Sequence, residues 1–413
     1  MVYVISKNGQ LLMPTKNYAK VRILLKNKKA KIIKRCPFTI QLVYDSTNYT
    51  QDITLGVDAG SKHIGLSATT KDRVLFESDV ELRNDIVDLL SARRQNRRTR
   101  RNHKTRYRKP RFDNRKRKYG WLAPSIQNKV DTHLTVIRRV HEILPITKII
   151  VEVASFDIQK IKNPTISGTE YQQGEQLDFW NVREYVLFRD GHTCQCCKGK
   201  SKDKILNVHH IESRQTGGNA PNNLITLCET CHTGFHKGTV KLPKTIKRGM
   251  SFRDATFMGI MRWYLYNKLK ETYPNVNLTY GYITKNTRIA NGLQKDHYID
   301  ARCISENPSA VSDGTVYYQK KVRCHNRQIH KNTILKGGIR KRNQADYEIK
   351  GFRLFDTIKY KGNTYIIFGR RNSGFFDIRK LDGIKVNNGS VSCKNMQLIH
   401  PNSNYLIEIR KCA

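Results

Sequence analysis

Four cysteines form two CxxC pairs with zinc-ligand spacing. Cys194 and Cys197 make the first pair, and Cys228 and Cys231 make the second, 30 residues further along the chain. Thiolates at this spacing can bind one tetrahedral Zn²⁺. The pattern therefore predicts a structural zinc site. Cys196 could replace a neighbouring ligand, and chance pairing of buried cysteines is the alternative to a metal site.

Four histidines also have spacings that suit metal binding. His209 and His210 are adjacent, and adjacent side chains on a strand point to opposite sides and can take different roles. His232 and His236 are four residues apart, so on a helix both can reach the same ion. Four thiolates already satisfy a zinc ion, which leaves these imidazoles for a second cation. The alternative is a purely structural zinc finger with a histidine ligand.

Three carboxylates lie in predicted strands or helices that could position them for chemistry. Asp58 closes a predicted strand over residues 53–58, Glu152 lies near the end of one over residues 148–153, and Asp300 lies in a predicted helix over residues 297–304. Carboxylates from distant segments can hold two divalent ions on a phosphate. Taken singly, an Asp after a strand is more often a turn residue, and a Glu that ends a strand is usually solvated. The hypothesis therefore depends on all three together.

The order of motifs in residues 179–240 resembles that of HNH nucleases of the zinc-stapled ββα-metal type. The resemblance implies that His210 is the general base, that Asn223 orients the loop carrying it, and that a divalent ion is held by His209 with one or both of His232 and His236. The motifs that carry it are His-His-Ile at 209–211, Gly-Gly-Asn at 217–219, Asn-Asn-Leu at 222–224, and Cys231-His232-x3-His236.

Each carboxylate also lies in a segment that resembles a motif of the RuvC/RNase H-like nucleases. These segments are residues 56–65, 149–152 and 296–301. The resemblance implies that Asp58, Glu152 and Asp300 bind two Mg²⁺ ions, and that His297, one helical turn before Asp300, is a further catalytic residue. Mg²⁺ is also expected in the HNH site.

The charge of the chain predicts a polyanionic partner. The 413 residues include 76 Lys or Arg and 34 Asp or Glu, a net charge of +42 that would cause strong self-repulsion if nothing neutralised it. Residues 93–118 hold 15 Lys or Arg and one acid, so they are either disordered or a helix held by a polyanion. A second basic cluster follows at residues 320–342, for which a solvated face is the alternative. The expected nucleic-acid-binding residues are Arg93, Arg94, Arg97, Arg98, Arg100, Arg101, Lys104, Arg106 and Arg108 in the first segment, and Arg323, Arg327, Arg340, Lys341 and Arg342 in the second.

Hydrophobic periodicity predicts the elements that position these residues. A helix over residues 121–145 has Val130, Leu134, Ile137 and Val140 on one face. Further helices are expected at 252–271 and 297–304. Strands are expected at 2–5, 32–33, 38–43, 53–58, 64–69, 148–153 and 278–283, with hairpin turns at 8–9 and 361–363.

No run of about 18 apolar residues and no secretory leader is evident, so neither a membrane span nor export is expected. The CxxC pairs suggest a reducing compartment, and the expected location is the prokaryotic cytoplasm, associated with the nucleoid.

Taken over its whole length, the chain resembles IscB, the transposon-encoded relative of type II CRISPR effectors. Leu11-Leu12-Met13-Pro14 is similar to that family's PLMP signature, with Leu in place of the first Pro. The resemblance implies an α+β multidomain fold with an RNase H-like (RuvC) α/β core that is split in sequence. The expected domains are a PLMP-like module (1–54), RuvC segment I (55–83), an Arg-rich bridge helix (84–118), RuvC segment II (119–165), an inserted HNH domain (175–245), RuvC segment III (246–310) and a β-rich RNA-binding and target-adjacent-motif-interacting domain (311–413).

The resemblance further implies an omega RNA guide as partner and a monomeric protein within the ribonucleoprotein. HNH would cut the guide-paired strand of target double-stranded DNA next to a short adjacent motif, and RuvC would cut the displaced strand. One alternative is a protein-only HNH/RuvC endonuclease. Another is a transposon RNA-binding regulator without nuclease activity, which the presence of Asp58, Glu152 and His210 disfavours.

Overall fold

The chain forms two compact units in the computed structural model. One comprises Met1–Ser155 and Phe257–Ala413, and the other comprises Phe156–Thr256, so the second is inserted into the chain of the first. The residues that the structure describes are 1–102, 121–153, 181–212, 220–246, 253–323, 333–334, 340–341, 346–402 and 404–412. Among them, no helix is both long and apolar enough to cross a membrane.

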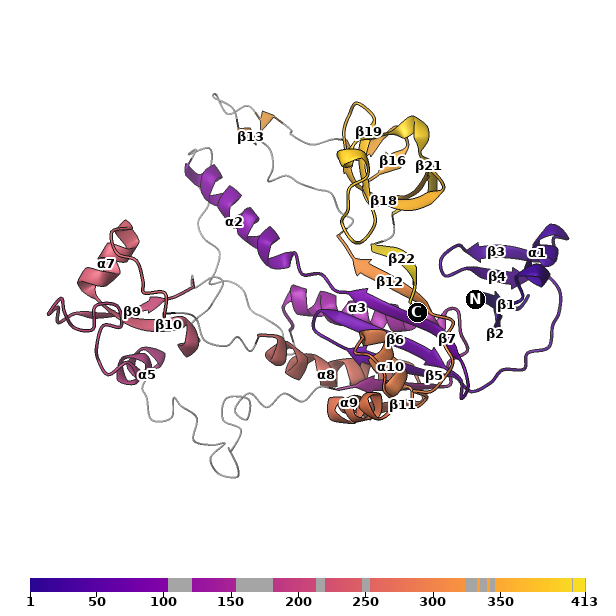
Figure 1. Ribbon diagram of the computed structural model, residues 1–413, viewed down its shortest axis with the longest axis horizontal. Coiled ribbons are helices and arrows are strands. Elements are labelled where there is room, and N and C mark those ends of the chain that lie inside the picture. Colours follow the sequence, from indigo (N-terminus) through magenta and orange to yellow (C-terminus); the bar gives the residue numbers. More distant parts are fainter. Residues whose placement is uncertain are drawn as a thin grey trace. The chain divides into compact units, whose positions relative to one another are not determined.

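A seven-stranded mixed sheet forms the centre of the first unit (Figure 1). Its strands are β5 (Thr54–Ala59), β6 (His63–Thr69), β7 (Val74–Glu81), β8 (Lys148–Glu152), β11 (Val276–Thr279), β12 (Thr315–Lys321) and β22 (Tyr405–Lys411). Their order across the sheet is β11-β8-β5-β6-β7-β12-β22. β5, β6 and β7 form an antiparallel meander, while β8 and β12 each join it by parallel pairing. Sheet pairing therefore brings together segments that lie far apart in the sequence.

Helices cover the two faces of this sheet. Leu55 and Val57 of β5 pack into a core with helices α3 (Pro124–His141) and α8 (Arg253–Thr272). Side chains alternate along a strand, so Gly56 and Asp58 face the opposite side. Helix α10 (His297–Ile304) lies on that side, over β5 and β6, and helix α9 (Gly281–Ala290) contacts α10. Asp58 is thereby placed beneath the helix that carries Asp300.

Two glycines allow α10 to lie close to the sheet. A Cβ atom added at Gly65 would lie 1.9 Å from the carbonyl oxygen of His297, and one added at Gly56 would lie 2.0 Å from that of Ala301. Both neighbours are backbone atoms of α10, so they cannot move without moving the helix. Glycine is therefore required at both positions for the observed helix-to-sheet distance.

Gly65→Ala is therefore expected to push α10 away from the sheet. Overpacking of this kind costs about 1–3 kcal/mol of stability, and a displacement of about 1 Å at a catalytic group can cost about 10²-fold in rate. Thermal unfolding and strand-specific DNA cleavage would measure the two effects. Gly259→Ala in α8 is the matched control, because a Cβ there meets no atom within 4 Å. Equal effects of the two substitutions would contradict this account.

Smaller sheets flank the central one within the first unit. The N-terminal sheet has the order β2-β1-β4-β3, with Val2, Val21 and Ile40 in its core. Its elements are β1 (Val2–Ile5), β2 (Leu11–Thr15), helix α1 (Tyr18–Lys26), β3 (Ala30–Lys34) and β4 (Thr39–Leu42). The C-terminal five-stranded sheet has the order β20-β19-β18-β17-β21 around Phe376 and Ile378. Its strands are β17 (Thr357–Tyr360), β18 (Asn363–Arg370), β19 (Phe375–Arg379), β20 (Val391–Ser392) and β21 (Gln397–His400), and the short pairs β13 (Thr333–Ile334) with β14 (Arg340–Lys341) and β15 (Glu348–Ile349) with β16 (Phe352–Arg353) precede it.

The inserted unit has one two-stranded sheet. Strand β9 (Leu206–His210) pairs antiparallel with β10 (Leu224–Cys228), and helix α7 (Glu229–Lys237) follows β10 directly. Helix α5 (Val182–Arg189) and the short helix η2 (Pro221–Asn223) contact β10. The described part of this unit therefore has the ββα order expected for it. The mixed α/β multidomain class is confirmed.

Three expectations about elements are corrected. The strand expected at residues 278–283 ends at Thr279, and Gly281 begins α9, because a short apolar run fits a strand end and a helix start equally well. Strand β7 was not expected, because Glu77 and Asp79 interrupt its apolar pattern, although Glu77 is buried and paired with Arg302. The third correction concerns residues 311–413. Their first and last long strands, β12 and β22, belong to the seven-stranded sheet, and the described strands between them form two two-stranded sheets and one five-stranded sheet.

Candidate active sites

The inserted unit brings three of the predicted histidines together. One ring nitrogen each of His209, His232 and His236 lies within 4.8 Å of the others. His209 comes from β9, and the other two come from successive turns of α7, where their Nε2 atoms are 3.3 Å apart. His210 follows His209 on the same strand and so points to the other side. The structure thus separates the predicted base from the predicted metal ligands.

The electrostatics of this cluster suit a cation. The Nε2 atom of His209 is buried and has no hydrogen-bond partner among the described residues. Burial, together with nearby His232 and His236, lowers the pKa of His209 to about 4. The imidazole is therefore neutral near pH 7, which is the form that binds a metal. An orphaned buried nitrogen that faces two further imidazoles fits a divalent ion.

Asn223 is fully buried and holds the segment that follows His210. Its Oδ1 accepts a hydrogen bond from the backbone N–H of Glu212 at 2.9 Å, and its Nδ2 donates to the carbonyl of Glu212 at 2.9 Å. The backbone N–H of Ile211 also donates to the carbonyl of Asn223. These three bonds hold the backbone that follows the predicted base His210.

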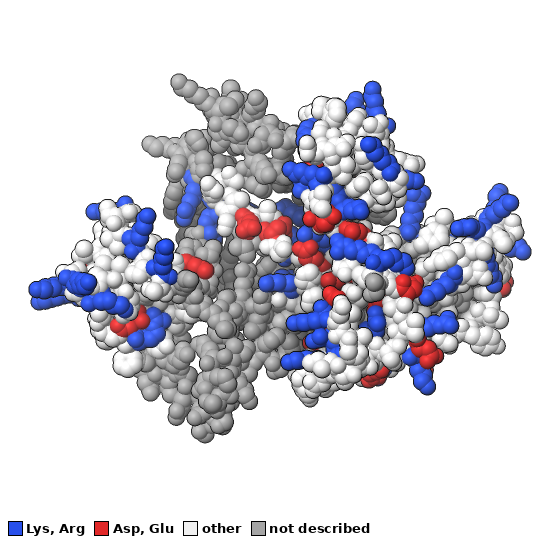
Figure 2. Space-filling view, in the orientation of Figure 1, with Lys and Arg blue, Asp and Glu red and all other residues white. Residues whose placement is uncertain are grey.

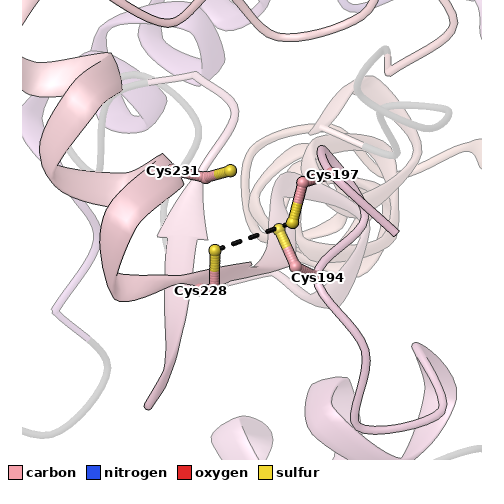
Figure 3. Close-up of side chains that lie close together, drawn as sticks. All are labelled: Cys194, Cys197, Cys228 and Cys231. Carbon is pink, nitrogen blue, oxygen red and sulfur yellow. Dashed lines mark hydrogen bonds between the residues drawn. The ribbon is translucent and has the colours of Figure 1, made fainter. Parts of the chain in front are cut away.

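The four CxxC cysteines converge at the other end of β10 (Figure 3). Their Sγ atoms all lie within 4.8 Å of one another, and those of Cys197 and Cys228 are 3.8 Å apart. A tetrahedral zinc with Zn–S bonds of about 2.3 Å requires sulfur atoms about 3.8 Å apart, so the cluster fits the ion. Cys196 is not part of this group. Four thiols of this geometry form a zinc-type Cys₄ site.

Ser201 supports the thiolate form of one cysteine of this cluster, Cys197, whereas burial raises the pKa values of Cys194 and Cys231. The Oγ of Ser201 lies 3.1 Å from the Sγ of Cys228 and 3.4 Å from that of Cys197. Hydrogen bonds from Ser201 lower the pKa of Cys197 to about 6. A thiolate is the species that binds zinc, so Ser201 favours metal binding over the protonated thiol.

In the first unit, Asp58 and His297 meet across 239 residues of sequence. The Nδ1 of His297 is 2.7 Å from Oδ2 of Asp58, and this bond raises the pKa of His297. Asp58 is the next-to-last residue of β5 and His297 is the first residue of α10, so the close contact of this helix with the sheet brings the two side chains together. Asp58 lies on a strand and His297 lies in a helix, as the sequence predicted.

Glu152 and Asp300 complete the carboxylate group. Burial, and then the negative charge of Asp58, raises the pKa of Glu152 to about 7, and the same two causes raise the pKa of Asp300. Carboxylates that disfavour each other's ionised form are a natural site for a cation. Oxygen ligands of this kind suit Mg²⁺. Among the described residues, the groups whose ligand atoms all lie within 4.8 Å of one another are the Cys and His clusters, and these three carboxylates are not one of them.

Three further residues at this site were not predicted. Arg288 of α9 lies with its Nε 2.8 Å from Oδ1 of Asp300. The ring of His63 stacks on that of His297, with centroids 4.9 Å apart and planes 6° apart, and its Nδ1 is 2.9 Å from Oδ1 of Asp79. His63 lies within the first carboxylate motif, so its position was visible in the sequence. No sequence motif marks Arg288 or Asp79 as a site residue, because only the packing of α9 and β7 brings them to the site.

The raised pKa of Glu152 predicts a stability effect. The folded protein binds this proton more tightly than the unfolded chain does, so stability falls as pH rises from about 4.5 to about 7 and stays lower above that. The difference is about 3 kcal/mol. In the presence of a chelator, Glu152→Gln should therefore raise the free energy of unfolding at pH 8 but not at pH 4.5. Denaturant titrations at both pH values would test this, and an equal change at both would contradict it.

The basic residues are only partly described. Helix α2 (Ile86–Asn102) carries Arg93, Arg97 and Arg98 as exposed side chains and Arg94 as a half-buried one. The described part of the bridge segment is thus helical. Arg323 is exposed beyond β12, and Figure 2 shows Lys and Arg side chains over all parts described on that face. The side chains of Arg100, Arg101, Lys104, Arg106, Arg108, Arg327, Arg340, Lys341 and Arg342 lie outside the described residues.

Comparisons with known families agree with this geometry. Residues 2–174 match the family described as RRXRR protein, and residues 194–238 match the HNH endonuclease family. Residues 97–101 read Arg-Arg-Thr-Arg-Arg, the pattern in the first family's name. Together the two matches support an IscB-like RuvC/HNH nuclease. The inserted unit contains the residues that match the HNH endonuclease family.

Individual relatives resemble parts of this IscB-like chain. A protein named Anaredoxin, from Nostoc sp., is 35% identical over 63 residues, which is 15% of this chain and 79% of that protein. Streptococcus thermophilus Cas9 in complex with AGGA PAM is 14% identical with a TM-score of 0.29, covering 44% of this chain and 26% of that one. The same protein with the AGAA PAM is 11% identical with a TM-score of 0.32, covering 62% and 32%. The chain thus spans a quarter to a third of the solved chains.

Proposed function

We propose that this IscB-like protein is an RNA-guided DNA endonuclease that makes double-strand breaks with two separate active sites. HNH cuts the strand paired with an omega RNA guide, and RuvC cuts the displaced strand. The observation that carries the proposal is the presence of two distinct catalytic groups, one in each compact unit. Asp58, Glu152, His297 and Asp300 belong to the first, and His209, His210, Asn223, His232 and His236 belong to the second.

In the HNH site, His210 takes the proton from the attacking water. The water oxygen then bonds to phosphorus while the bond from phosphorus to the leaving oxygen breaks. Asn223 keeps the backbone beside His210 in place through its bonds to Glu212. His209, His232 and His236 hold one divalent ion, which neutralises charge on the phosphate when bound.

In the RuvC site, Asp58, Glu152 and Asp300 would hold Mg²⁺ ions, which would supply stabilisation of charge on the phosphate. His297 transfers a proton at the reacting phosphate, and its contact with Asp58 orients the imidazole ring. Arg288 neutralises Asp300 and so stabilises the carboxylate group. Proton transfer by a positioned residue of this kind typically contributes 10²–10⁴-fold to the rate.

Guide dependence is tested by the RNA that the protein carries. We expect purified protein to contain RNA that resists moderate salt, and cleavage of a plasmid to follow the guide portion of that RNA when it is replaced. Sequencing the RNA and programming a new target provide the measurement. Cleavage of the same sites by RNA-free protein would instead support a protein-only endonuclease.

The Arg-rich helix supplies a second prediction. Replacing Arg97, Arg98, Arg100 and Arg101 with Ala should weaken RNA binding and flatten its salt dependence. Each lost phosphate contact should reduce the log–log slope by roughly 0.7–0.9. Filter binding at several salt concentrations would measure the slope, with Lys7→Ala, an exposed N-terminal lysine, as control. An unchanged slope would mean that this segment is a solvated face.

A further inference from the structure

Two exposed tyrosines lie side by side where β11 ends and α9 begins. The side chains of Tyr280 and Tyr282 belong to residues that are 45% and 66% exposed. Their ring centroids are 6.2 Å apart, and the ring planes are within 11° of parallel. Large aromatic rings at the surface are costly to leave in water, and a parallel pair presents flat faces suited to another flat ring.

This tyrosine pair lies beside the RuvC carboxylates. Thr279, which precedes Tyr280, pairs with Glu152 in the parallel ladder. Gly281 separates the two tyrosines, and a Cβ added there would lie 3.0 Å from Oε1 of Glu152. The backbone between the rings is therefore in contact with a predicted metal ligand.

The neighbouring charges favour a nucleic acid over an apolar protein segment. Lys285 lies exposed one turn further along α9, and Lys295 lies exposed in the loop before α10. Exposed aromatic rings next to cations are the combination with which proteins bind single strands, since bases stack on the rings and phosphates pair with the cations. A duplex keeps its bases stacked inside, so only an unpaired strand can use these rings.

We propose that Tyr280 and Tyr282 form a stacking platform for unpaired bases of the DNA strand that enters the RuvC site. The platform holds the bases next to the scissile phosphate and so sets which phosphate lies over Asp58, Glu152 and Asp300. This inference rests on the proposed function, because the displaced strand is the substrate assigned to that site. Both tyrosines act as positioning residues, and neither takes part in bond breaking.

A chemical double-mutant cycle tests the platform in the guide-loaded ribonucleoprotein. The substrates are synthetic target duplexes in which single nucleotides near the displaced-strand cut lack their base, one position at a time. Single-turnover cleavage of that strand is measured for wild type, for the Tyr280→Leu/Tyr282→Leu variant and for the Tyr280→Phe/Tyr282→Phe variant. Cleavage of the guide-paired strand in the same reaction reports folding, guide binding and target binding.

One or two abasic positions should slow displaced-strand cleavage by wild type about 5- to 150-fold, the effect of losing a stacked base. The leucine variant should be slow on intact DNA, with no further loss at those positions. The phenylalanine variant should behave as wild type, because stacking needs the ring and not the hydroxyl. Tyr49→Leu, at a residue 88% exposed, should change nothing.

Other outcomes overturn the platform. Additive effects of the leucine substitutions and the missing base would show that the rings do not contact that base. Loss of both cuts in the leucine variant would assign the tyrosines to folding. Sensitivity to missing bases in the guide RNA, and not in the DNA, would assign them to RNA binding. If wild type cut the guide-paired strand but not the displaced strand, the proposed function itself would be contradicted. This result differs from every outcome that contradicts the platform alone.

Discussion

Asp58→Ala is expected to convert a double-strand break into a nick. The substitution removes a RuvC carboxylate and the partner of His297, but leaves the HNH unit untouched. His210→Ala should have the opposite effect, because it removes the HNH base. Loss of such a group costs about 10²–10⁴-fold in rate, which silences one cut on the timescale of an assay. With guide RNA and supercoiled target plasmid, wild type should produce linear DNA, and each variant should produce nicked circles.

Strand mapping makes this prediction specific. The nicks of the two variants should lie on opposite strands, with the guide-paired strand cut by Asp58→Ala protein. The double variant should bind target without cutting, because its basic surface is unaltered. Asp72→Ala, an exposed turn residue next to the same sheet, is the control and should cut both strands. Should Asp58→Ala abolish both cuts while target binding stays normal, one composite centre would be the better description.

Replacing Cys194 and Cys228 together with Ala is expected to unfold the HNH unit. Structural zinc contributes about 10–16 kcal/mol of apparent binding energy in small zinc domains, which equals or exceeds the stability of a typical domain. One hydrophobic cluster in the described part of this unit is built around Cys194, Cys228 and Cys231, with Ile225 and Leu227 as its other buried members. The first unit should stay folded, because its core contains no residue of the inserted unit.

Elemental analysis and limited proteolysis measure the two parts of this expectation. Wild type should contain about one zinc per chain, and the double variant should lose it and be cleaved within the inserted unit. Cys196→Ala is the matched control, since Cys196 lies between two ligands yet outside the group of four sulfur atoms. Zinc content well below one in wild type, or zinc loss in Cys196→Ala, would contradict the Cys₄ assignment.

Much of the HNH site could be predicted because its geometry is local. The CxxC spacing, the adjacent histidines and the pair four residues apart each define positions within one turn, strand or helix. The antiparallel pair β9 and β10, with α7 directly after β10, then brings His209 to His232 and His236. Where an element's own geometry sets the distance between two side chains, the sequence is sufficient.

The RuvC site depends on contacts between residues far apart in the sequence, which no local sequence pattern predicts. Asp58 and His297 meet because Gly56 and Gly65 allow α10 to lie close to the sheet. Arg288 pairs with Asp300 because α9 packs on α10, and no helix was expected at residues 281–290. Such contacts join segments far apart in sequence, so they follow from packing and not from periodicity.

The sequence by itself determined the residue types of both catalytic groups, the zinc ligands, most strands and helices of the core, and the excess of positive charge. Only the tertiary structure decided that β7 is a central strand with a buried Glu77, that β12 and β22 complete the seven-stranded sheet, and that Gly281, between Tyr280 and Tyr282, lies against Glu152. The physical reason is that amphipathic spacing records which side of an element is buried. It does not record the partner against which that side is buried, because many apolar surfaces are interchangeable until close packing selects one.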